Sequence, residues 1–512
     1  MVCIELLTSL VVVFLALYYY FTSTFNFWKT RDVPGPKPVP VLGNLKNIIN
    51  GHSAIDDYIT KLYYEYKNEP MIGIFVKRTP NLILTDLDLI KDVLIKDFST
   101  FNDRGITLFP RAEPLSLNIF SLEAERWRPL RMRLSPIFTS GKLKDMFPLI
   151  LECSNALEGC LEKIIKEEKL LDCREVAARF TTDVIGSCIF GISMNALADE
   201  GSEFRQLGKR MFEVGNKARL RGILREVAPW LYCTLALLLP SHKVTTFLTK
   251  MVSETIRYRK ENSVVRPDFI NVLMELKYNP HKLENIEVTD TLLTAQAAIF
   301  FAAGFETSSS TIGHALYEMA LNPEVQEKLR KEIKEFYEKN KGNWTYENIK
   351  EMSYLDKVFK ETLRKYPPVT VLKRRCNSNY TFSGTKVSIP KDTVVHIPVY
   401  AIHTDPDHYK NPEVFDPERF NEDAEASRHP MCLLPFGDGP RNCIGARFAV
   451  YQTKIGLIQM LKNYRVDVSD ETMIPYEKHP FSHLLAPKRS LLLKISKVQS
   501  QTSDSNNVHI GE

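Results

Sequence analysis

The apolar segment LLTSLVVVFLALYYYF, at residues 6–21, is the feature that most constrains how this chain can fold. With its flanks it reaches the roughly 20 residues that a helix needs to cross a bilayer. Only Glu5 precedes it, whereas Lys29, Arg31 and Lys37 follow it, so the positive-inside rule places the bulk of the chain on the cytoplasmic face. A cleaved signal peptide is the alternative, but the segment has neither a basic n-region nor a clear small-x-small cleavage site. We therefore expect a retained single-pass membrane anchor.

The segment that follows the anchor is rich in proline. VPGPKPVPVLGN, at residues 33–44, is expected to form an extended linker that holds the globular part at a fixed attitude to the membrane. The polar tail from Gln499 is expected to be disordered. The predicted organisation is an anchor over residues 1–28, a proline-rich linker over 29–49, one large domain over 50–498 and a disordered tail over 499–512.

Helical periodicity dominates the predicted domain, and short apolar runs typical of strands lie at its two ends. The helical segments are residues 147–169, 292–321, 322–340 and 446–464, and the strand-like runs are 71–76, 81–85, 393–399 and 490–495. The sequence therefore predicts a mainly α fold with a small β subdomain. A formal net charge of +5 over 512 residues is mild and argues against a dedicated nucleic-acid binder. Nine cysteines at low density, with no C-x-x-C pair, argue against a disulfide framework or a zinc module.

The stretch FGDGPRNCIG, at residues 436–445, concentrates glycines, a proline and an arginine around one cysteine. A phosphate-binding loop is excluded because Asn442 stands where a third glycine is needed and Pro440 lacks an amide donor. A zinc site is excluded because no second ligand lies at a suitable spacing. A turn with an incidental buried cysteine and a thiolate ligand loop remain.

Two features of this stretch favour the thiolate ligand loop. Gly437 and Gly439 permit positive φ, so that the backbone can aim N–H groups at the sulfur. A helix is expected to begin directly after Gly445, and its dipole is expected to lower the pKa of Cys443.

Every specified position of this stretch matches F-x-x-G-x-R-x-C-x-G, and the chain thereby resembles the haem-thiolate monooxygenases of the cytochrome P-450 superfamily. The resemblance implies the cytochrome P-450 fold and a haem b whose iron is held by Cys443, a thiolate that favours O–O cleavage. It implies that Phe436 shields the sulfur and that Arg441 pairs with an anionic group of the haem. The segments FNDRG, FSLEAERWRPLR and FTSGKLKDMF look closest to microsomal members of the insect detoxification type. Val33 stands where many members have proline and is expected to loosen the hinge at most.

The segment AAGFET, at residues 302–307, lies inside the longest predicted helix and places Glu306 and Thr307 in apolar surroundings. A threonine hydroxyl bonded to its own i−4 carbonyl is the plain alternative. The resemblance implies instead that Glu306 and Thr307 deliver protons to bound dioxygen. It also implies that Ala303 and Gly304 keep the helix surface close to the iron.

Further arginines resemble the family's cofactor and structural positions. In WRPLR, Trp127 and Arg131 are expected to bond haem propionates, and Arg374 is expected to do the same, with its neighbour Arg375 as the competing candidate. Arginine suits this role because its planar fork binds carboxylates in bidentate fashion.

A structural network is expected from ETLR and FDPERF. Glu361 and Arg364 lie at i, i+3 on one helix face, where a solvated surface pair is the ordinary alternative. The resemblance implies that they join Arg419 in a buried charged network beneath the haem-binding half.

The substrate pocket is expected to be apolar and aromatic, suited to lipophilic substrates. Its candidate residues, taken from segments that line the distal haem face in relatives, are Ile106, Phe109, Phe120, Phe300, Ala303, Thr307, Val369, Val371 and Leu484.

The resemblance implies a monooxygenase that inserts one atom of O₂ into lipophilic substrates, such as plant toxins or insecticides. Because the chain has no dinucleotide fingerprint, electrons from NADPH are expected through NADPH–cytochrome P-450 reductase, with cytochrome b5 as a further partner. The expected location is the endoplasmic reticulum membrane, with the domain on its cytoplasmic face. A basic surface expected to steer the reductase comprises Arg126, Arg128, Arg133, Lys142 and Lys144.

Several alternatives stay open from the sequence. Residues 228–240, APWLYCTLALLLP, are too short to span a bilayer and form either a buried helix or a second membrane-dipping surface. A haem-thiolate isomerase or dehydratase acting on peroxides is the nearest rival function, and a hydroxylase of endogenous hormones or lipids is another. A non-catalytic haem or lipid binder is the rival from a different class.

Overall fold

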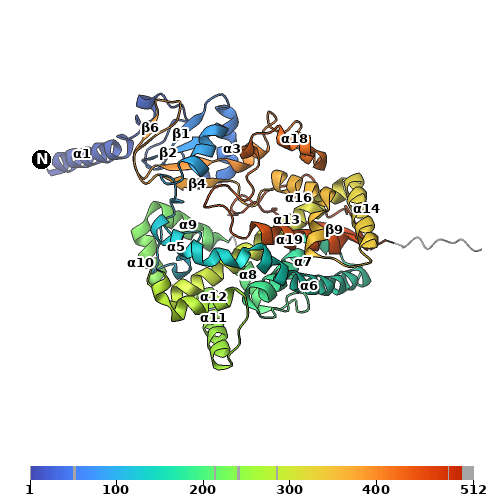
Figure 1. Cartoon of the computed structure of the whole chain (residues 1–512). Helices are drawn as coiled ribbons and strands as arrows, with labels where there is room; N and C mark the ends of the chain where they lie inside the picture. The colour runs from blue at the N-terminus through green and yellow to red at the C-terminus, as the bar shows by residue number, and fades with distance from the viewer. Residues whose placement is uncertain are drawn as a thin grey trace, which may run out of the picture.

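The computed structural model describes residues 2–49, 54–212, 215–238, 243–283, 286–482 and 484–498. Helices make up most of this part of the chain (Figure 1). The α-helices are α1 (Val2–Thr22), α2 (Lys46–Ile49), α3 (Ile55–Glu65), α4 (Leu87–Lys91), α5 (Ala124–Leu134), α6 (Ser140–Lys166), α7 (Cys173–Ile185), α8 (Glu203–Met211), α9 (Asn216–Val227), α10 (Pro229–Leu238), α11 (Lys243–Glu261), α12 (Phe269–Tyr278), α13 (Asp290–Leu321), α14 (Pro323–Lys339), α15 (Tyr346–Lys350), α16 (Ser353–Lys365), α17 (Val399–His403), α18 (Glu422–Ala426) and α19 (Ala446–Leu461). Short 3₁₀ or π turns are η1 (Lys29–Arg31), η2 (Asp92–Lys96), η3 (Pro114–Ser116), η4 (Ser135–Phe138), η5 (Gly186–Phe190), η6 (Pro280–Lys282), η7 (Pro417–Phe420) and η8 (Pro430–Cys432).

The strands form small sheets. They are β1 (Met71–Val76), β2 (Thr79–Leu84), β3 (Leu171–Asp172), β4 (Leu372–Arg375), β5 (Tyr380–Thr381), β6 (Ser388–Ile389), β7 (Val394–Ile397), β8 (Tyr464–Asp467) and β9 (Leu492–Lys497). In the four-stranded sheet, β1 and β2 pair antiparallel, β7 runs parallel to β2, and β4 pairs antiparallel with β7. β9 lies between β3 and β8, and β5 pairs with β6. A mainly α fold with a small β component is therefore confirmed.

The predicted anchor is a single helix, α1, that projects from the rest of the molecule (Figure 1). Its window Ile4–Thr22 is long and apolar enough to cross a membrane, and none of that window is buried against the protein. An exposed apolar helix of this length is compatible with a membrane anchor.

The linker after α1 is docked on the four-stranded sheet. Trp28 is buried against β1, and its indole N–H donates to the carbonyl of Ile74 at 3.0 Å. A Cβ on Gly73 would lie 2.3 Å from the Trp28 ring, so a glycine is needed there to admit the indole. Val33 is buried as well, and the N–H of Gly73 donates to the carbonyl of Pro34 at 2.8 Å. The Val33 side chain thus packs into the core, and the expectation of at most a looser hinge stays a prediction.

The long helix α13 crosses the domain and packs on α7, α11, α16 and α19. Its side chains are buried along most of its length, which explains why its sequence has no extended polar face. Ala303 and Gly304 were expected to keep the helix surface close to the iron, and a Cβ on Gly304 would lie 2.2 Å from Cδ1 of Ile185 on α7. Gly304 therefore admits α7, and Ala303 is the residue of that pair that is exposed to solvent.

The predicted segments correspond to observed elements. The four helical segments became α6, α13, α14 and α19, and the strand-like runs became β1, β2, β7 and β9. Most of residues 228–240 forms α10, on which Trp230 is 74% exposed while Tyr232 is buried. The predicted disordered tail, 499–512, lies outside the described residues.

Candidate active site

The cysteine loop, residues 436–445, folds back on itself directly before α19. The N–H of Cys443 donates to the carbonyl of Phe436 at 2.9 Å. Gly437 and Gly439 adopt φ of 66° and 71°, which confirms the predicted positive φ at both positions. A Cβ on Gly439 would lie 1.9 Å from the carbonyl oxygen of Leu94, so this glycine also permits a close backbone contact.

A buried polar relay connects the cysteine loop to α16. The N–H of Leu434, two residues before the loop, donates to Nε2 of His403 at 2.8 Å. Nδ1 of the same ring lies 3.2 Å from the carbonyl of Arg364, which assigns the proton to Nδ1. Burial and the nearby Arg364 guanidinium lower the pKa of His403 to about 3, so the ring stays neutral and keeps Nε2 as an acceptor.

The predicted structural network is assembled at the other end of this relay. Arg364 Nε and Nη2 donate to the two carboxylate oxygens of Glu361 at 2.6 and 2.7 Å, and both side chains are fully buried. Arg419 Nε lies 3.4 Å from Glu361 Oε1, and the Asp416 N–H donates to the same oxygen at 3.0 Å. The surface-pair alternative is therefore excluded, because a bidentate pair at zero exposure is fully desolvated.

The thiol of Cys443 is reachable by solvent but has protein on most sides. Its residue is exposed, whereas burial raises the pKa of the thiol; the Gly445 N–H and the guanidiniums of Arg131 and Arg104 act in the opposite direction. Both observations hold if the thiol faces a space inside the fold. In the protein alone, burial outweighs these contacts and raises the pKa of the thiol overall, so the expected lowering by the α19 dipole stays a prediction.

Four arginines from separate segments gather beside Cys443. Arg104 Nη2 donates to the carbonyl of Arg441 at 2.9 Å, and Arg131 donates to the carbonyl and side-chain oxygens of Asn442, each at 3.1 Å. Arg374 and Arg441 are nearly fully buried, and burial lowers the pKa of each to about 10. Burial, followed by the charges of the other three arginines, lowers the pKa of Arg104 well below its usual range.

These arginines have the donors that a flat dianionic cofactor needs. None of the four forms an ion pair with a carboxylate anywhere in the described part of the chain. Nε of Arg374 and both Nε and Nη1 of Arg441 are buried without a hydrogen-bond partner. Arg374 and Arg441 are buried without an ion pair, although Asp103 and Glu123 act on Arg441 from a greater distance. Burial of a cation is costly, so a bound anion would stabilise this group. The two propionates of a haem fit this set.

Arg374 and Arg375, the two candidates for the propionate ligand, have different surroundings. Arg375 Nη2 pairs with Asp103 at 3.0 Å, and its side chain is 37% exposed. Arg374 is buried and keeps an unpartnered Nε, which favours it as the propionate ligand. Trp127 is buried under the Arg441 guanidinium, 4.6 Å from ring centroid to Cζ, which places the indole within the same group.

On α13, Thr307 and Glu306 are directed to different partners. Thr307 Oγ1 donates to the carbonyl of Ala303 at 2.8 Å, which is the i−4 hydrogen bond given above as the alternative to a proton-delivery role. Ala303 itself is exposed, although α13 is buried on either side of it. Glu306 is buried and forms an ion pair with Nη2 of Arg174 on α7. The structure therefore places Thr307 at the solvent-accessible face of α13, while the Glu306 carboxylate is bonded to α7.

The predicted pocket residues differ in how far they are buried. Phe300 is buried in the main core, stacked on Phe138 at 5.6 Å between ring centroids and tilted on Phe269 at 4.4 Å. Phe120 is 44% exposed beneath the Arg104 guanidinium. The remaining candidates are half-buried and stay predictions as pocket residues: Ile106, Phe109, Val369, Val371 and Leu484.

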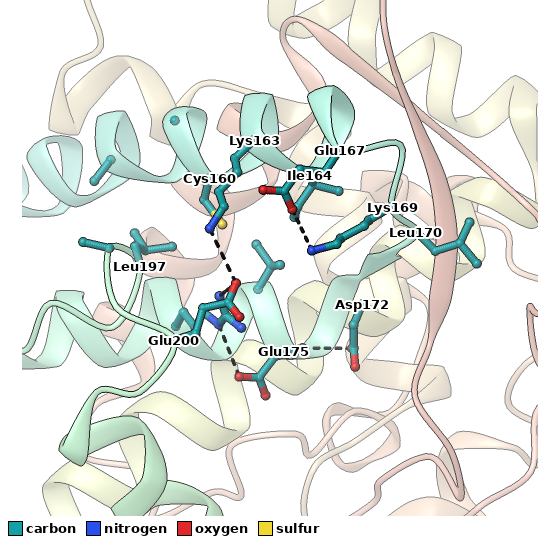
Figure 2. A pocket seen from close by; sticks show the side chains of 15 residues that line it. Cys160, Lys163, Ile164, Glu167, Lys169, Leu170, Asp172, Glu175, Leu197 and Glu200 are labelled. Carbon is teal, nitrogen blue, oxygen red and sulfur yellow. Dashed lines mark hydrogen bonds and ion pairs between the residues drawn. The ribbon is translucent and has the colours of Figure 1, made fainter.

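Two surface features outside this site are neutralised by their own ion pairs. In the predicted basic surface, Arg126 pairs with Glu123, Lys142 with Asp145 and Lys144 with Glu347, which leaves a weaker positive surface than the sequence indicates. A surface cavity of about 400 Å³ lies between α6 and α7 and shares no residue with the cysteine loop; Figure 2 shows side chains that line it. Most of its charged side chains pair with one another, as in Lys169–Glu167 at 2.7 Å, and the free thiol of Cys160 also lines it.

Three residues near the site were missed by the sequence analysis. Arg104 lies in the segment FNDRG, and an arginine there could have been proposed as a further cofactor ligand. Arg174 and Gln296 carried no signal, because each acquires its role only by contact with a distant segment. Gln296 is fully buried on α13 and accepts from the N–H of Ile119 at 2.8 Å.

Comparison with known proteins agrees with this geometry. The family model described as Cytochrome P450 matches residues 33–495. Probable cytochrome P450 6a14 from Drosophila melanogaster is 39% identical over 93% of this chain and 96% of its own length. Cytochrome P450 6B1 from Papilio polyxenes is 37% identical over 94% of this chain and 97% of its own, and Cytochrome P450 6A1 from Musca domestica is 38% identical over 94% and 96%.

Proposed function

The chain belongs to the cytochrome P450 family, and from that premise we propose that Cys443 is the axial thiolate ligand of the haem iron and that the protein oxidises lipophilic xenobiotics. It is a cytochrome P450 monooxygenase, with haem b held through a cysteine thiolate and electrons delivered to O₂ chemistry through a reductase. The assignment of particular residues and of the substrate class is the proposal.

One observation carries the residue assignment. Four arginines that form no ion pair in the described part of the chain gather beside Cys443, and Arg374 and Arg441 keep buried, unpartnered nitrogens. A structural turn with an incidental cysteine gives no reason for these free donors. A dianionic haem does, because its propionates neutralise the cations.

When bound, the haem supplies the reductive activation of O₂. The Cys443 thiolate would donate electron density to the iron, with the Gly445 N–H held near the sulfur to moderate its charge. Arg374, Arg441 and Trp127 would orient the ring by binding one edge. The relay through His403 and Leu434 would hold the cysteine loop in position.

On the exposed face of α13, the Thr307 hydroxyl would hold the proton that the reaction requires. Thr307 already donates to the Ala303 carbonyl and can turn its hydroxyl toward the reacting side without moving the helix. Glu306 lies next in sequence; after leaving Arg174, its carboxylate would accept a proton from water and pass it to Thr307. Arg174 has a buried unpartnered Nε, so it retains a donor for other acceptors when Glu306 moves.

The finer functional assignments rest on chemical character. The half-buried side chains of Ile106, Phe109, Val369 and Leu484 are apolar and suit lipophilic xenobiotics such as plant toxins or insecticides. The exposed helix α1 supports attachment to the endoplasmic reticulum membrane, where NADPH–cytochrome P450 reductase and cytochrome b5 would be partners. A screen of plant toxins, insecticides and steroids by binding spectra distinguishes detoxification from hormone metabolism.

The residue assignment is tested by the spectrum of the ferrous–CO complex. The native protein should show the red-shifted Soret band of thiolate ligation, and Cys443→Ser should abolish it. Cys432→Ser is the matched control, because this cysteine is buried outside the loop, and it should keep the band. An unchanged spectrum in Cys443→Ser overturns the ligand assignment. Conversion of hydroperoxides without O₂ consumption, with reductase and NADPH present, would favour an isomerase or dehydratase.

A further inference from the structure

The chain folds into a hairpin near its C-terminus, and this hairpin carries one of the predicted pocket residues. Its first arm is residues 473–482, and its second arm, residues 484–488, begins with Leu484. The two arms are paired through the backbone, where the His479 N–H donates to the Ala486 carbonyl at 2.8 Å. A displacement of the first arm is therefore passed on to the second arm.

The second arm lies against the part of α13 that carries Thr307. Ser310 Oγ donates to the Leu485 carbonyl at 3.4 Å, and Ser310 follows Thr307 at i, i+3 on the same side of the helix. The Leu485 N–H donates to the Pro368 carbonyl at 3.0 Å, so the segment after α16 is the other support of this arm. Leu484 is half-buried next to these contacts. A shift of the arm would therefore change the space near Thr307.

The first arm is held to α13 by a buried histidine. His314 Nε2 lies 2.9 Å from the Tyr476 hydroxyl, and Nδ1 of the same ring lies 2.7 Å from the Ser310 carbonyl. The contact with a carbonyl assigns the proton to Nδ1, so Nε2 accepts a hydrogen bond that the Tyr476 hydroxyl donates. His314 is 1% exposed and stacks on Tyr366 at 4.3 Å between ring centroids. Hydrogen bonds and stacking together fix the orientation of the ring.

Both members of this hydrogen bond are uncharged in the folded protein. Burial, followed by the charge of the Arg174 guanidinium, lowers the pKa of His314 to about 3. Burial also raises the pKa of Tyr476, so its hydroxyl keeps the proton that it donates. Salt therefore has little effect on this bond, whereas it weakens the ion pair between Lys478 of the same arm and Asp57.

We propose that His314 and Tyr476 are positioning residues whose hydrogen bond sets where Leu484 lies in the pocket, and thereby which shapes of lipophilic ligand the pocket accepts. The proposal rests on the proposed function only in taking Leu484 to line the pocket. Without the bond, the Tyr476 hydroxyl loses its acceptor and gains by turning toward water, which displaces the first arm. The second arm follows through its pairing with the first, and Leu484 moves relative to Thr307.

Other contacts keep the hairpin attached when this bond is removed. The Tyr317 hydroxyl donates to the Met473 carbonyl at 2.9 Å, and Lys478 Nζ forms an ion pair with Asp57. These contacts lie on either side of Tyr476 in the sequence, so the arm stays in place at both points while its middle gains freedom. The expected result is a change in the shape of the pocket with the cysteine loop intact.

The first test compares the binding of two isomeric ligands, 1-phenylimidazole and 4-phenylimidazole, to the full-length haem-loaded protein. Each dissociation constant is measured from the shift of the Soret band. The ratio of the two constants reports the shape of the pocket, because any change at the iron affects both ligands alike. His314→Phe keeps a ring that can stack on Tyr366 and removes the acceptor for Tyr476. We expect the ratio to change by about two- to tenfold, the effect of one hydrogen bond in a protein interior.

Further variants show whether the hydrogen bond itself is responsible. Tyr476→Phe removes the same bond from its other side and should change the ratio in the same direction. The double variant should differ from the native protein no more than either single variant does. Tyr464→Phe is the matched control, because this buried tyrosine donates to Glu162 at 2.8 Å elsewhere in the domain, and it should leave the ratio unchanged. A ratio in His314→Phe equal to that of the control, or additive effects in the double variant, would overturn the positioning role.

Leu484→Ala separates this proposal from the proposed function. If Leu484 lines the pocket, its truncation should change the ratio by about threefold or more. An unchanged ratio shows that the pocket assignment fails. Adding His314→Phe to Leu484→Ala should have no further effect, because the side chain to be positioned is gone. A further change as large as that in the native background refutes the positioning role and leaves the pocket assignment intact.

A second measurement depends on neither the haem nor a ligand. Amide hydrogen exchange at His479 and Leu485 should be faster in His314→Phe and in Tyr476→Phe than in the native protein, with β1 and β2 unchanged. Equal protection in all three proteins refutes the positioning role even if the ligand ratio changed. If neither imidazole binds to the native protein, the proposed function fails, and hydrogen exchange still decides the positioning role.

Discussion

Replacing Glu361 by glutamine tests how the fold supports the cysteine loop. The Glu361 carboxylate accepts both Arg364 Nε and Nη2, and neither side chain is exposed. Glutamine has nearly the same shape, but it carries no charge and its amide NH₂ faces the Arg364 donors. The variant therefore leaves the Arg364 cation buried without its counter-charge.

The cost follows from burial and from the bonds that remain. Breaking a fully buried ion pair destabilises a protein by about 3–5 kcal/mol. Arg364 keeps its bonds to the carbonyls of His403 at 2.9 Å and Pro412 at 2.8 Å, which solvate part of its charge. We therefore expect the free energy of unfolding to fall by about 3 kcal/mol, the lower end of that range. The free energy of unfolding of ordinary domains is about 5–15 kcal/mol, so this loss is a large share of it.

Two assays measure the consequence. Urea unfolding of the full-length protein, followed by circular dichroism, gives the change in stability. The ferrous–CO spectrum reports the loop itself, because Arg364 is connected through His403 to Leu434 before the loop. We expect the red-shifted band to decay faster on warming in Glu361→Gln than in the native protein.

The control is Glu275→Gln, which loses a pair with Lys282 whose side chains are 49% and 34% exposed. Exposed pairs contribute at most about 1 kcal/mol, so this variant should stay close to the native protein. A loss below about 1 kcal/mol in Glu361→Gln, equal to that of the control, would contradict the claim that this network is a buried support.

Three further predictions concern proton delivery, backbone fit and acid stability. Thr307→Ala should lower product formed per NADPH by about tenfold or more and release hydrogen peroxide, because general acid catalysis is lost; unchanged coupling, measured as product against NADPH consumed, would exclude this role. Gly439→Ala should destabilise the protein by about 2 kcal/mol or more in the same urea assay, because the added Cβ would meet the Leu94 carbonyl at 1.9 Å and φ is positive there. The control Gly159→Ala, whose Cβ would have nothing within 4 Å, should be neutral or stabilising. Burial lowers the pKa of His403 and of two other buried histidines from the ordinary 6.5 to about 3, so the unfolded chain binds protons that the folded protein refuses. Stability should therefore be complete above pH 6.5 and fall as the pH drops toward 3, by up to about 1.4 kcal/mol per pH unit for each histidine; a flat stability between pH 6.5 and 5 would show that these rings are not held neutral.

The sequence by itself determined the features that depend on short segments. The apolar run before Thr22 needed only its length to indicate a spanning helix, and α6, α13, α14 and α19 followed from helical spacing. The positive φ of Gly437 and Gly439 followed from the glycine content of one loop. Such patterns are local, because hydrogen bonds along a helix or across a turn connect residues close in sequence.

The tertiary structure alone decided which partner each polar side chain meets. Arg374 and Arg375 are indistinguishable as neighbours in sequence, and they separate only because Asp103 neutralises one while the other is buried without a carboxylate. Glu306 was placed beside Thr307 by sequence, but the packing of α7 gives it Arg174 as a partner.

Packing between distant segments also decided what three further residues contact. Val33 became core because the linker docks on β1, and Gly304 serves the contact between α13 and α7. Phe300, expected in the pocket, is stacked within the aromatic core. Each outcome depends on contacts between segments that lie roughly tens to hundreds of residues apart in the sequence. Periodicity along one segment carries no information on what packs against it.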